Sequence, residues 1–153
     1  MRFAEYQNYK ESTGLLFWQS STLWQRKVKQ ALQSYDLTHT QFVILAVIEE
    51  LSEQEICITQ KKISNFSMID VMTISSTIRL LEKKKLVSRT SHKTDTRANS
   101  ITNTESGRNI LKQAVMEVEQ VDKAFFFNDK GENTQFQKFL STLLEKNIAK
   151  TGQ

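Results

Sequence analysis

The sequence predicts a mainly α-helical protein with one small β hairpin, and three observations support this fold class. Proline is absent and glycine occurs four times in 153 residues, so few residues interrupt a helix. Apolar residues recur at spacings of three and four along most of the chain, as amphipathic helices require. One stretch differs, because residues 86–102 place two short strand-like segments around a polar turn at residues 90–96.

The first third of the chain predicts two helices and a short strand. Helical spacing over residues 13–35 predicts the first helix. Thr38 and Gln41 form a capping-box pattern, in which each side chain satisfies a backbone N–H group of the other residue. A second helix is therefore expected to begin there and to continue to Leu51. After a polar loop, the Ile-Cys-Ile triplet at residues 56–58 predicts a short strand.

Two further helices are expected close together in the middle of the chain. Thr59 is placed to cap a short helix, and Asp70 is placed to cap a longer one over residues 71–84. On the longer helix, one narrow sector that we expect to face the core holds Val71, Ile74, Ile78 and Leu81. The opposite side holds Met72, Thr73, Ser76, Arg79 and Lys83.

The C-terminal part predicts two long helices, one from Thr104 to about Phe127 and one over about residues 134–148. The first carries a seam of apolar residues at alternating steps of three and four, as in a coiled coil: Leu111, Ala114, Val118, Val121 and Phe125. Apolar seams therefore occur at both ends of the chain.

The order of elements in the middle of the chain is that of a winged helix-turn-helix, in which a second helix enters a DNA groove and a hairpin flanks it. The charge pattern agrees with this interpretation. Residues 79–97 hold seven Lys and Arg residues against two acidic ones, a local charge of +5 in a chain of net charge +4. A local basic patch is typical of a protein that binds a polyanion. The alternative is an ordinary solvated amphipathic helix with a lysine-rich end.

If the helix reads DNA, its polar side supplies the base contacts. We expect Thr73, Ser75, Ser76 and Arg79 to face the major groove, with Ser75 at its edge. Lys83, Arg89 and Lys93 would neutralise phosphates, and Arg97 at the hairpin would reach the minor groove. Asp95 would stiffen the hairpin through a salt bridge to Arg97, or it is a solvated turn residue.

Several other function classes lack their residue patterns. His39, His92 and Cys57 are not spaced as a metal site, so no metal is expected. The isolated glycines exclude a phosphate-binding loop, and no catalytic triad pattern occurs, so we predict neither an enzyme nor a cofactor. A redox role for Cys57 would need a lowered pKa, of which the sequence gives no sign. No apolar run approaches the ~20 residues that span a membrane, and no signal peptide is seen, so a cytoplasmic protein is expected.

The chain resembles the MarR family of bacterial winged-helix transcription regulators. The resemblance covers about residues 13–148 and rests on Leu37, Thr38, Gln41, Phe42 and Leu45, on Ile58, Thr59, Gln60 and Ile63, on Thr73, Ile74, Ile78, Leu81, Glu82, Leu86 and Val87, and on Asp95, Arg97, Ile101, Thr104 and Gly107. Two positions depart from the family pattern. Lys85 stands where a glycine is usual, and Asn103 stands where a leucine is usual.

The resemblance implies a homodimer that binds double-stranded DNA, with residues 13–35 and 104–148 forming the dimerisation helices and residues 37–103 the DNA-binding region. Two-fold symmetry would place two reading helices on a pseudo-palindromic operator. Such a protein is expected to act as a repressor that a small-molecule effector releases. The aromatic residues that could line an effector pocket, or could be plain core residues, are Trp18, Trp24, Tyr35 and Phe42. The alternative function is a winged-helix module that binds proteins and not DNA.

Overall fold

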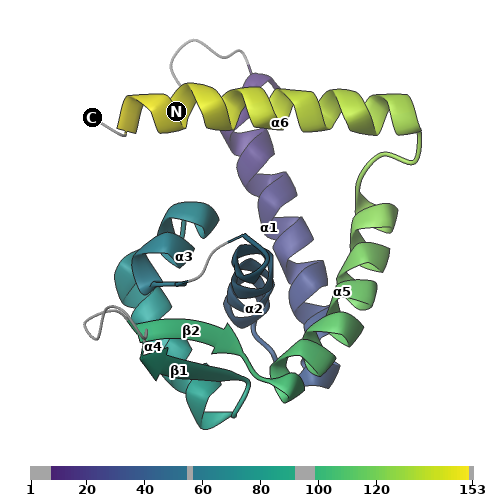
Figure 1. Cartoon of the computed structure of the whole chain (residues 1–153). Coiled ribbons are helices and arrows are strands. Elements are labelled where there is room, and N and C mark those ends of the chain that lie inside the picture. The colour runs from purple at the N-terminus through teal and green to yellow at the C-terminus, as the bar shows by residue number, and fades with distance from the viewer. Residues whose placement is uncertain (1–7, 55–56, 92–98, 152–153) are drawn as a thin grey trace. The chain divides into compact units, whose positions relative to one another are not determined.

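The structure is a computed structural model that describes residues 8–54, 57–91 and 99–151 (Figure 1). In chain order its helices are η1 Tyr9–Glu11, α1 Thr13–Leu32, η2 Gln33–Tyr35, α2 His39–Ser52, α3 Gln60–Ser67, α4 Val71–Lys83, α5 Glu105–Phe125 and α6 Lys130–Thr151. Two strands, β1 Val87–Ser91 and β2 Asn99–Asn103, pair in antiparallel register between α4 and α5. The mainly helical winged fold predicted from the sequence is confirmed. The chain divides into two compact units, Met1–Val118 and Glu119–Gln153.

Local side-chain caps determine where the central helices begin. The Thr38 hydroxyl accepts from the backbone N–H of Gln41 at 3.1 Å, and the Gln41 side chain accepts from the backbone N–H of Thr38 at 3.2 Å. This reciprocal pair is the predicted capping box. Thr59 and Asp70 cap α3 and α4 through their side-chain oxygens, as their positions in the sequence predict.

The core of the first unit is built around α2. Figure 1 shows α2 between α1 on one side and the hairpin, α3 and α4 on the other, and α2 contacts all of these elements. The largest fully buried side chains are Val28, Leu32, Ile44, Leu45, Ile48, Ile58, Ile63, Ile74, Ile78, Leu81 and Ile101. This apolar core holds α4 and the hairpin against α2, so one surface of α4 remains for solvent or a ligand.

The buried face of α4 differs from the prediction at one residue. Ile74, Ile78 and Leu81 are fully buried, as predicted, but Val71 is 48% exposed. Thr77 is buried in its place. Val71 is no farther than Thr77 from the centre of the Ile74, Ile78 and Leu81 sector on the helical wheel. Its exposure therefore follows from its place as the first helical residue, beyond the end of the core.

The predicted strand at residues 56–58 is wrong for the two residues that the structure describes. Cys57 and Ile58 have no regular secondary structure, and Ile56 lies outside the described residues. The carbonyl of Ile58 accepts one backbone bond from Ile101 at 2.9 Å, but its N–H donates to the Ser100 hydroxyl at 3.2 Å. Because a side chain takes this second bond, no backbone ladder forms there.

The turn after α4 contains one of the two departures from the family pattern. Lys85 has a φ of 60°, in the left-handed region that glycine adopts without strain. Its N–H donates to the Glu82 carbonyl, and the N–H of Leu86 donates to the Leu81 carbonyl, both at 2.9 Å. This pair of bonds is a Schellman motif, which ends the helix and begins the strand. Lysine in place of glycine therefore keeps the backbone path, at a cost of about 1–2 kcal/mol.

The start of α5 packs against this same turn. A Cβ atom on Gly107 would lie 2.1 Å from the carbonyl oxygen of Leu86, so the close approach of the two backbones requires glycine. The Thr104 hydroxyl donates to the Lys85 carbonyl at 2.7 Å and accepts from the Gly107 N–H at 3.0 Å. The end of α4, the hairpin and α5 are thus joined at one point.

The second unit contains the end of α5 and all of α6. Aromatic rings pack at the connection, where the ring centroid of Phe136 lies 5.8 Å from that of Phe126 and 5.4 Å from that of Phe127. Several apolar side chains of α6 remain exposed: Phe139, Leu143, Leu144 and Ile148. No described helix combines the length and the apolar character that a membrane span needs.

Candidate nucleic-acid interface

The N-terminal end of α4 is organised by Asp70. One carboxylate oxygen accepts from the backbone N–H of Thr73 at 2.8 Å, and the other accepts from the Thr73 hydroxyl at 2.6 Å. The bond from the Thr73 hydroxyl, together with the backbone bonds, holds the pKa of Asp70 below its ordinary value. Asp70 is therefore ionised at neutral pH, and both of its oxygens are engaged with Thr73.

The four predicted base contacts and the predicted phosphate contact Lys83 all lie on α4, but they differ in exposure. Ser76, Arg79 and Lys83 are exposed, while Thr73 and Ser75 are half-buried. The Ser76 hydroxyl donates to the Thr73 carbonyl at 3.1 Å. With 13 residues, α4 is about 20 Å long, and a major groove about 12 Å wide admits a helix of this kind.

Apolar side chains interrupt this polar face. Met72 is 83% exposed and Leu80 is 50% exposed. In a major groove such side chains can contact the methyl group of thymine. Without DNA they are exposed to water, as single apolar residues on a protein surface commonly are.

The basic residues at the end of α4 divide into two kinds. Both Lys83 and Lys84 are exposed, but the ammonium group of Lys84 lies against oxygens of Asp36 and Gln41. It donates to the backbone carbonyl of Asp36 and, at 3.2 Å, to the side chain of Gln41, and it lies 3.4 Å from the Asp36 carboxylate. Lys84 thus joins the end of α4 to the preceding helices, while Lys83 remains available to a ligand.

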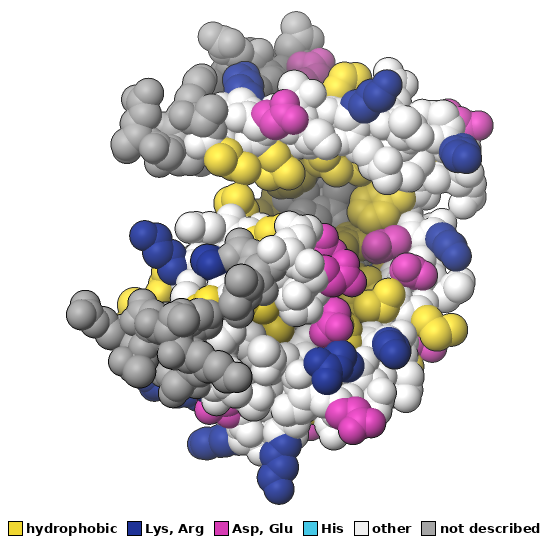
Figure 2. All heavy atoms as spheres, in the orientation of Figure 1, with side chains coloured by type: hydrophobic (Ala, Val, Ile, Leu, Met, Phe, Trp, Pro, Cys, Tyr) yellow, Lys and Arg dark blue, Asp and Glu magenta, His cyan; other side chains and the backbone are white. Residues whose placement is uncertain are grey.

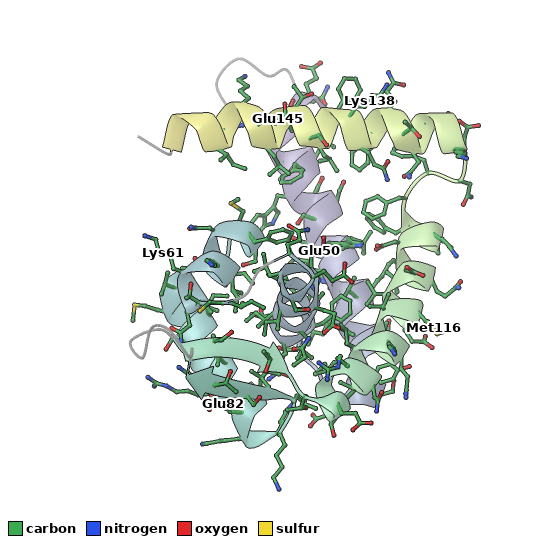
Figure 3. All side chains as sticks on the ribbon, viewed as in Figure 1. Glu50, Lys61, Glu82, Met116, Lys138 and Glu145 are labelled. Carbon is green, nitrogen blue, oxygen red and sulfur yellow. The ribbon has the colours of Figure 1, made fainter. Side chains whose placement is uncertain are left out.

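Arg89 is also engaged inside the protein. Its Nε donates to the carboxylate of Glu82 at 2.5 Å, and its side chain is only 29% exposed. Figure 3 labels Glu82 on α4 beside the hairpin. This ion pair joins β1 to α4, so a phosphate contact by Arg89 would have to use the guanidinium nitrogens on its other side.

The tip of the hairpin carries predicted contacts that lie outside the described residues. These are Lys93, Asp95 and Arg97, together with His92. The described strands pair from Val87 opposite Asn103 to Ser91 opposite Asn99, so the segment 92–98 connects two paired strand ends. The proposed roles of its side chains stay predictions.

Asn103, the second departure from the family pattern, connects the hairpin to α2 by hydrogen bonds. It is buried, and its amide nitrogen donates to the Leu45 carbonyl and to the Glu49 carboxylate, each at 2.9 Å. Its backbone carbonyl accepts from Arg108 of α5 at 3.0 Å. An apolar side chain at this position could pack but could not make the two bonds of the amide nitrogen.

The predicted effector-pocket residues differ in exposure. Trp18 is 70% exposed, whereas Trp24, Tyr35 and Phe42 are half-buried. Trp24 packs edge-on against His39, with ring centroids 5.2 Å apart. A separate, open surface hollow of about 350 Å³ lies on α2 and α3 and is lined by Leu51, Lys62, Asn65 and Phe66. The assignment of the four aromatic residues to an effector site stays a prediction.

Within residues 8–54, 57–91 and 99–151, no group of three His, Cys, Asp or Glu residues is placed to hold a metal ion. Cys57 is a half-buried free thiol, and its backbone carbonyl accepts from the ammonium group of Lys62 at 2.7 Å.

Lys61 was not among the predicted contacts, and Lys84 was counted in the basic patch of residues 79–97 without its internal partners. Lys61 is exposed and points outward from α3, which packs against α4 (Figure 3). Figure 2 shows Lys and Arg side chains over α3 and around the hairpin and α4. The position of Lys61, two residues after the cap at Thr59, was the available signal. Lys84 gave no local signal of its internal role, because its partners lie more than forty residues away.

Comparisons with known proteins agree with this geometry. A model of the MarR family matches residues 37–98. The chain is 40% identical over 115 residues to an uncharacterised HTH-type transcriptional regulator, YdcH of Bacillus subtilis, and the match covers 75% of this chain and 78% of the relative. It is also 32% identical over 139 residues to the HTH-type transcriptional regulator SarZ of Staphylococcus epidermidis, covering 89% of this chain and 88% of the relative.

A solved structure shows the same fold. The crystal structure of the S. aureus MepR–DNA complex superposes with a TM-score of 0.79 and 23% sequence identity, over 91% of this chain and 99% of that one.

Proposed function

The chain belongs to the MarR family of transcription regulators, and on that premise we propose that it binds double-stranded DNA sequence-specifically as a homodimeric repressor. The observation that carries this proposal is the outward face of α4. Its hydroxyl groups and Arg79 can reach base edges, while Ile74, Ile78 and Leu81 hold the opposite face in the core. The fold is shared with MepR, which was solved as a DNA complex, and this likeness supports DNA binding.

Exposed apolar residues in the helices at both ends of the chain support the homodimer. On α1 these include Leu16, Phe17, Trp18 and Leu23, and on α6 they include Phe139, Leu143, Leu144 and Ile148. Apolar surface of this extent is typical of an interface. A two-fold symmetric dimer would present two copies of α4 to half-sites about one helical turn, ~34 Å, apart.

Release by a small molecule is the regulatory part of the proposal. The half-buried Trp24, Tyr35 and Phe42 lie on α1, η2 and α2, so their aromatic rings belong to consecutive elements of the chain. Aromatic side chains of this kind bind planar apolar ligands. Because α2 contacts α4, a ligand bound among these rings would alter how α4 is held.

A protein-binding module is the second candidate, and the exposed Met72 and Leu80 favour it. The two functions separate in one experiment, in which the protein selects from a pool of random-sequence duplexes. A DNA-binding regulator enriches an inverted repeat, whereas a protein-binding module enriches no sequence.

The substitution Arg79→Ala tests the reading face directly. Loss of a bidentate guanine contact should weaken binding to the selected duplex by about 1–3 kcal/mol and relax selectivity at one base pair of each half-site. Fluorescence anisotropy on the selected duplex and on its single-base variants measures both effects. Arg26→Ala, at an exposed arginine of α1, is the matched control and should leave affinity and selectivity unchanged.

Salt provides an independent check of the same proposal. Each phosphate contact contributes to the slope of log affinity against log salt concentration, so wild-type binding should weaken steeply with added salt. A flat salt response, or an Arg79→Ala variant with wild-type affinity and selectivity, would contradict the proposal.

A further inference from the structure

In the protein without DNA, the Thr73 hydroxyl already donates its one proton to a hydrogen bond with Asp70. It lies 2.6 Å from a carboxylate oxygen of Asp70. An ionised carboxylate can only accept hydrogen bonds, so the proton of this bond must come from Thr73. A threonine hydroxyl has one proton and two lone pairs. Thr73 therefore offers other partners an acceptor and a methyl group, but no donor.

The negative charge of Asp70 strengthens the hydrogen bond that the Thr73 hydroxyl donates to it. Its pKa is lowered, chiefly by the bond from the Thr73 hydroxyl, so the carboxylate stays charged throughout the neutral range. Hydrogen bonds to an ionised acceptor are about twice as strong as those between neutral groups. A base edge offers only a neutral acceptor and cannot readily draw this proton away.

Ser76 provides a contrast on the same helix face. Its hydroxyl donates to the neutral carbonyl of Thr73 at the longer distance of 3.1 Å. A serine hydroxyl rotates freely, and a base acceptor can replace a neutral backbone carbonyl at little cost. Ser76 can therefore donate or accept according to the base it meets, whereas Thr73 cannot.

We propose that Asp70 is a specificity-determining residue that fixes Thr73 as a hydrogen-bond acceptor, so that α4 selects a base with an amino group at the position that Thr73 contacts. In the major groove the amino groups are those of adenine N6 and cytosine N4. Guanine offers only acceptors there, and thymine offers an acceptor and a methyl group. This inference rests on the proposed DNA-binding function and specifies which base edges it recognises.

The substitution Asp70→Asn can reverse the direction of the hydrogen bond between the side chain of residue 70 and the Thr73 hydroxyl. Asparagine is as good an N-cap as aspartate, and its carbonyl oxygen can accept the Thr73 backbone N–H. Its NH₂ group can then donate to the Thr73 hydroxyl oxygen, which frees the hydroxyl proton to donate to DNA. The helix start is preserved, while Thr73 changes from an acceptor to a donor.

The experiment compares selection from random duplexes by the wild-type protein, Asp70→Asn and Thr73→Val. Valine keeps the shape of threonine but replaces the hydroxyl with a methyl group, so its effect identifies the base position that Thr73 contacts. At that position the wild-type protein should prefer adenine or cytosine over guanine or thymine by roughly 3- to 10-fold in affinity. One hydrogen bond typically contributes a difference of this size. Asp70→Asn should shift the preference to guanine or thymine.

A second aspartate cap provides the matched control. Asp129 caps α6 by accepting from the backbone N–H of Glu132 at 2.9 Å. Asp129→Asn makes the same change of charge and of cap as Asp70→Asn, but on a helix with no proposed role in reading bases. It should leave the base preference unchanged at every position.

The outcomes separate this inference from the proposed function. Uniformly tighter binding of Asp70→Asn to all four bases would show that Asp70 acts through its charge alone and would overturn the inference. A Thr73→Val variant that keeps the wild-type preference would show reading through the methyl group and would overturn it as well. If the wild-type protein enriches no sequence, the proposed function fails and the inference fails with it.

Discussion

Helices α4 and α6 both carry apolar residues, but they differ in how much of that surface the chain itself buries. On α4, Ile74, Ile78 and Leu81 are fully buried, and α6 instead leaves Phe139, Leu143 and Leu144 exposed. The core face of α4 is thus buried within one chain, whereas α6 leaves several of its apolar side chains exposed. We infer that one chain is sufficient to fold and hold α4. A second copy of the chain is needed to bury the exposed apolar side chains of α6.

The largest effect should come from a cavity under α4. Ile78→Ala removes buried methyl and methylene groups and should lower the free energy of unfolding by about 2–5 kcal/mol. Urea unfolding followed by circular dichroism measures the change. Because the Ile78 side chain packs within one chain, the destabilisation should be the same at every protein concentration. A destabilisation that grows on dilution would show that Ile78 acts through a partner.

A matched pair of leucines sharpens the comparison between the two helices. Leu143 on α6 is 52% exposed, and Leu80 on α4 is 50% exposed. Leu143→Ser should raise the dissociation constant of the homodimer by about tenfold or more, since two-fold symmetry removes the side chain from both subunits. Leu80→Ser should leave the dimer unchanged. Sedimentation velocity at several concentrations measures both, and equal behaviour of the two variants would refute the distinction.

The smallest effect separates two neighbouring lysines. Lys84→Met removes an ammonium group held by Asp36 and Gln41, and it should cost about 1 kcal/mol of stability or less. Because that ammonium group is engaged within the protein, the salt dependence of DNA binding should hardly change. Lys83→Met should do the reverse. It should leave stability unchanged and reduce the salt slope by about one for each phosphate that the lysine no longer neutralises.

Anisotropy titrations over a range of salt concentrations and urea unfolding of both variants complete this test. If Lys84→Met lowers the salt slope as much as Lys83→Met, Lys84 binds phosphate and its link to the α1–α2 turn is not its main role.

The features that the sequence predicted well are those with local causes. The capping box of Thr38 and Gln41 and the caps at Thr59 and Asp70 depend on residues three positions apart, so the pattern alone indicates them. The same holds for the central part of the α4 core face, where helical spacing decides burial. The prediction for Val71 failed because its burial depends on where the neighbouring core ends, which spacing does not reveal.

The candidate site was predicted less completely. Some basic side chains that were assigned to DNA contacts or to the basic patch instead bind residues elsewhere in the protein. Lys84 belongs to the basic patch by sequence, but Asp36 and Gln41 engage it from the other end of the winged region. Arg89 was expected at a phosphate, and the structure pairs it with Glu82. The roles of Lys93, Asp95 and Arg97, which lie outside the described residues, stay predictions.

One chain is sufficient to fold and hold α4, the proposed DNA-reading helix, but we propose that two chains are needed to bind the DNA site. Sedimentation equilibrium of the protein with its selected duplex tests this claim most directly, because it counts the chains on each DNA molecule. We predict one complex of two chains per duplex, formed on an inverted repeat with half-site centres about one helical turn, ~34 Å, apart. A complex of one chain per duplex, bound as tightly to a single half-site as to the full repeat, would contradict it.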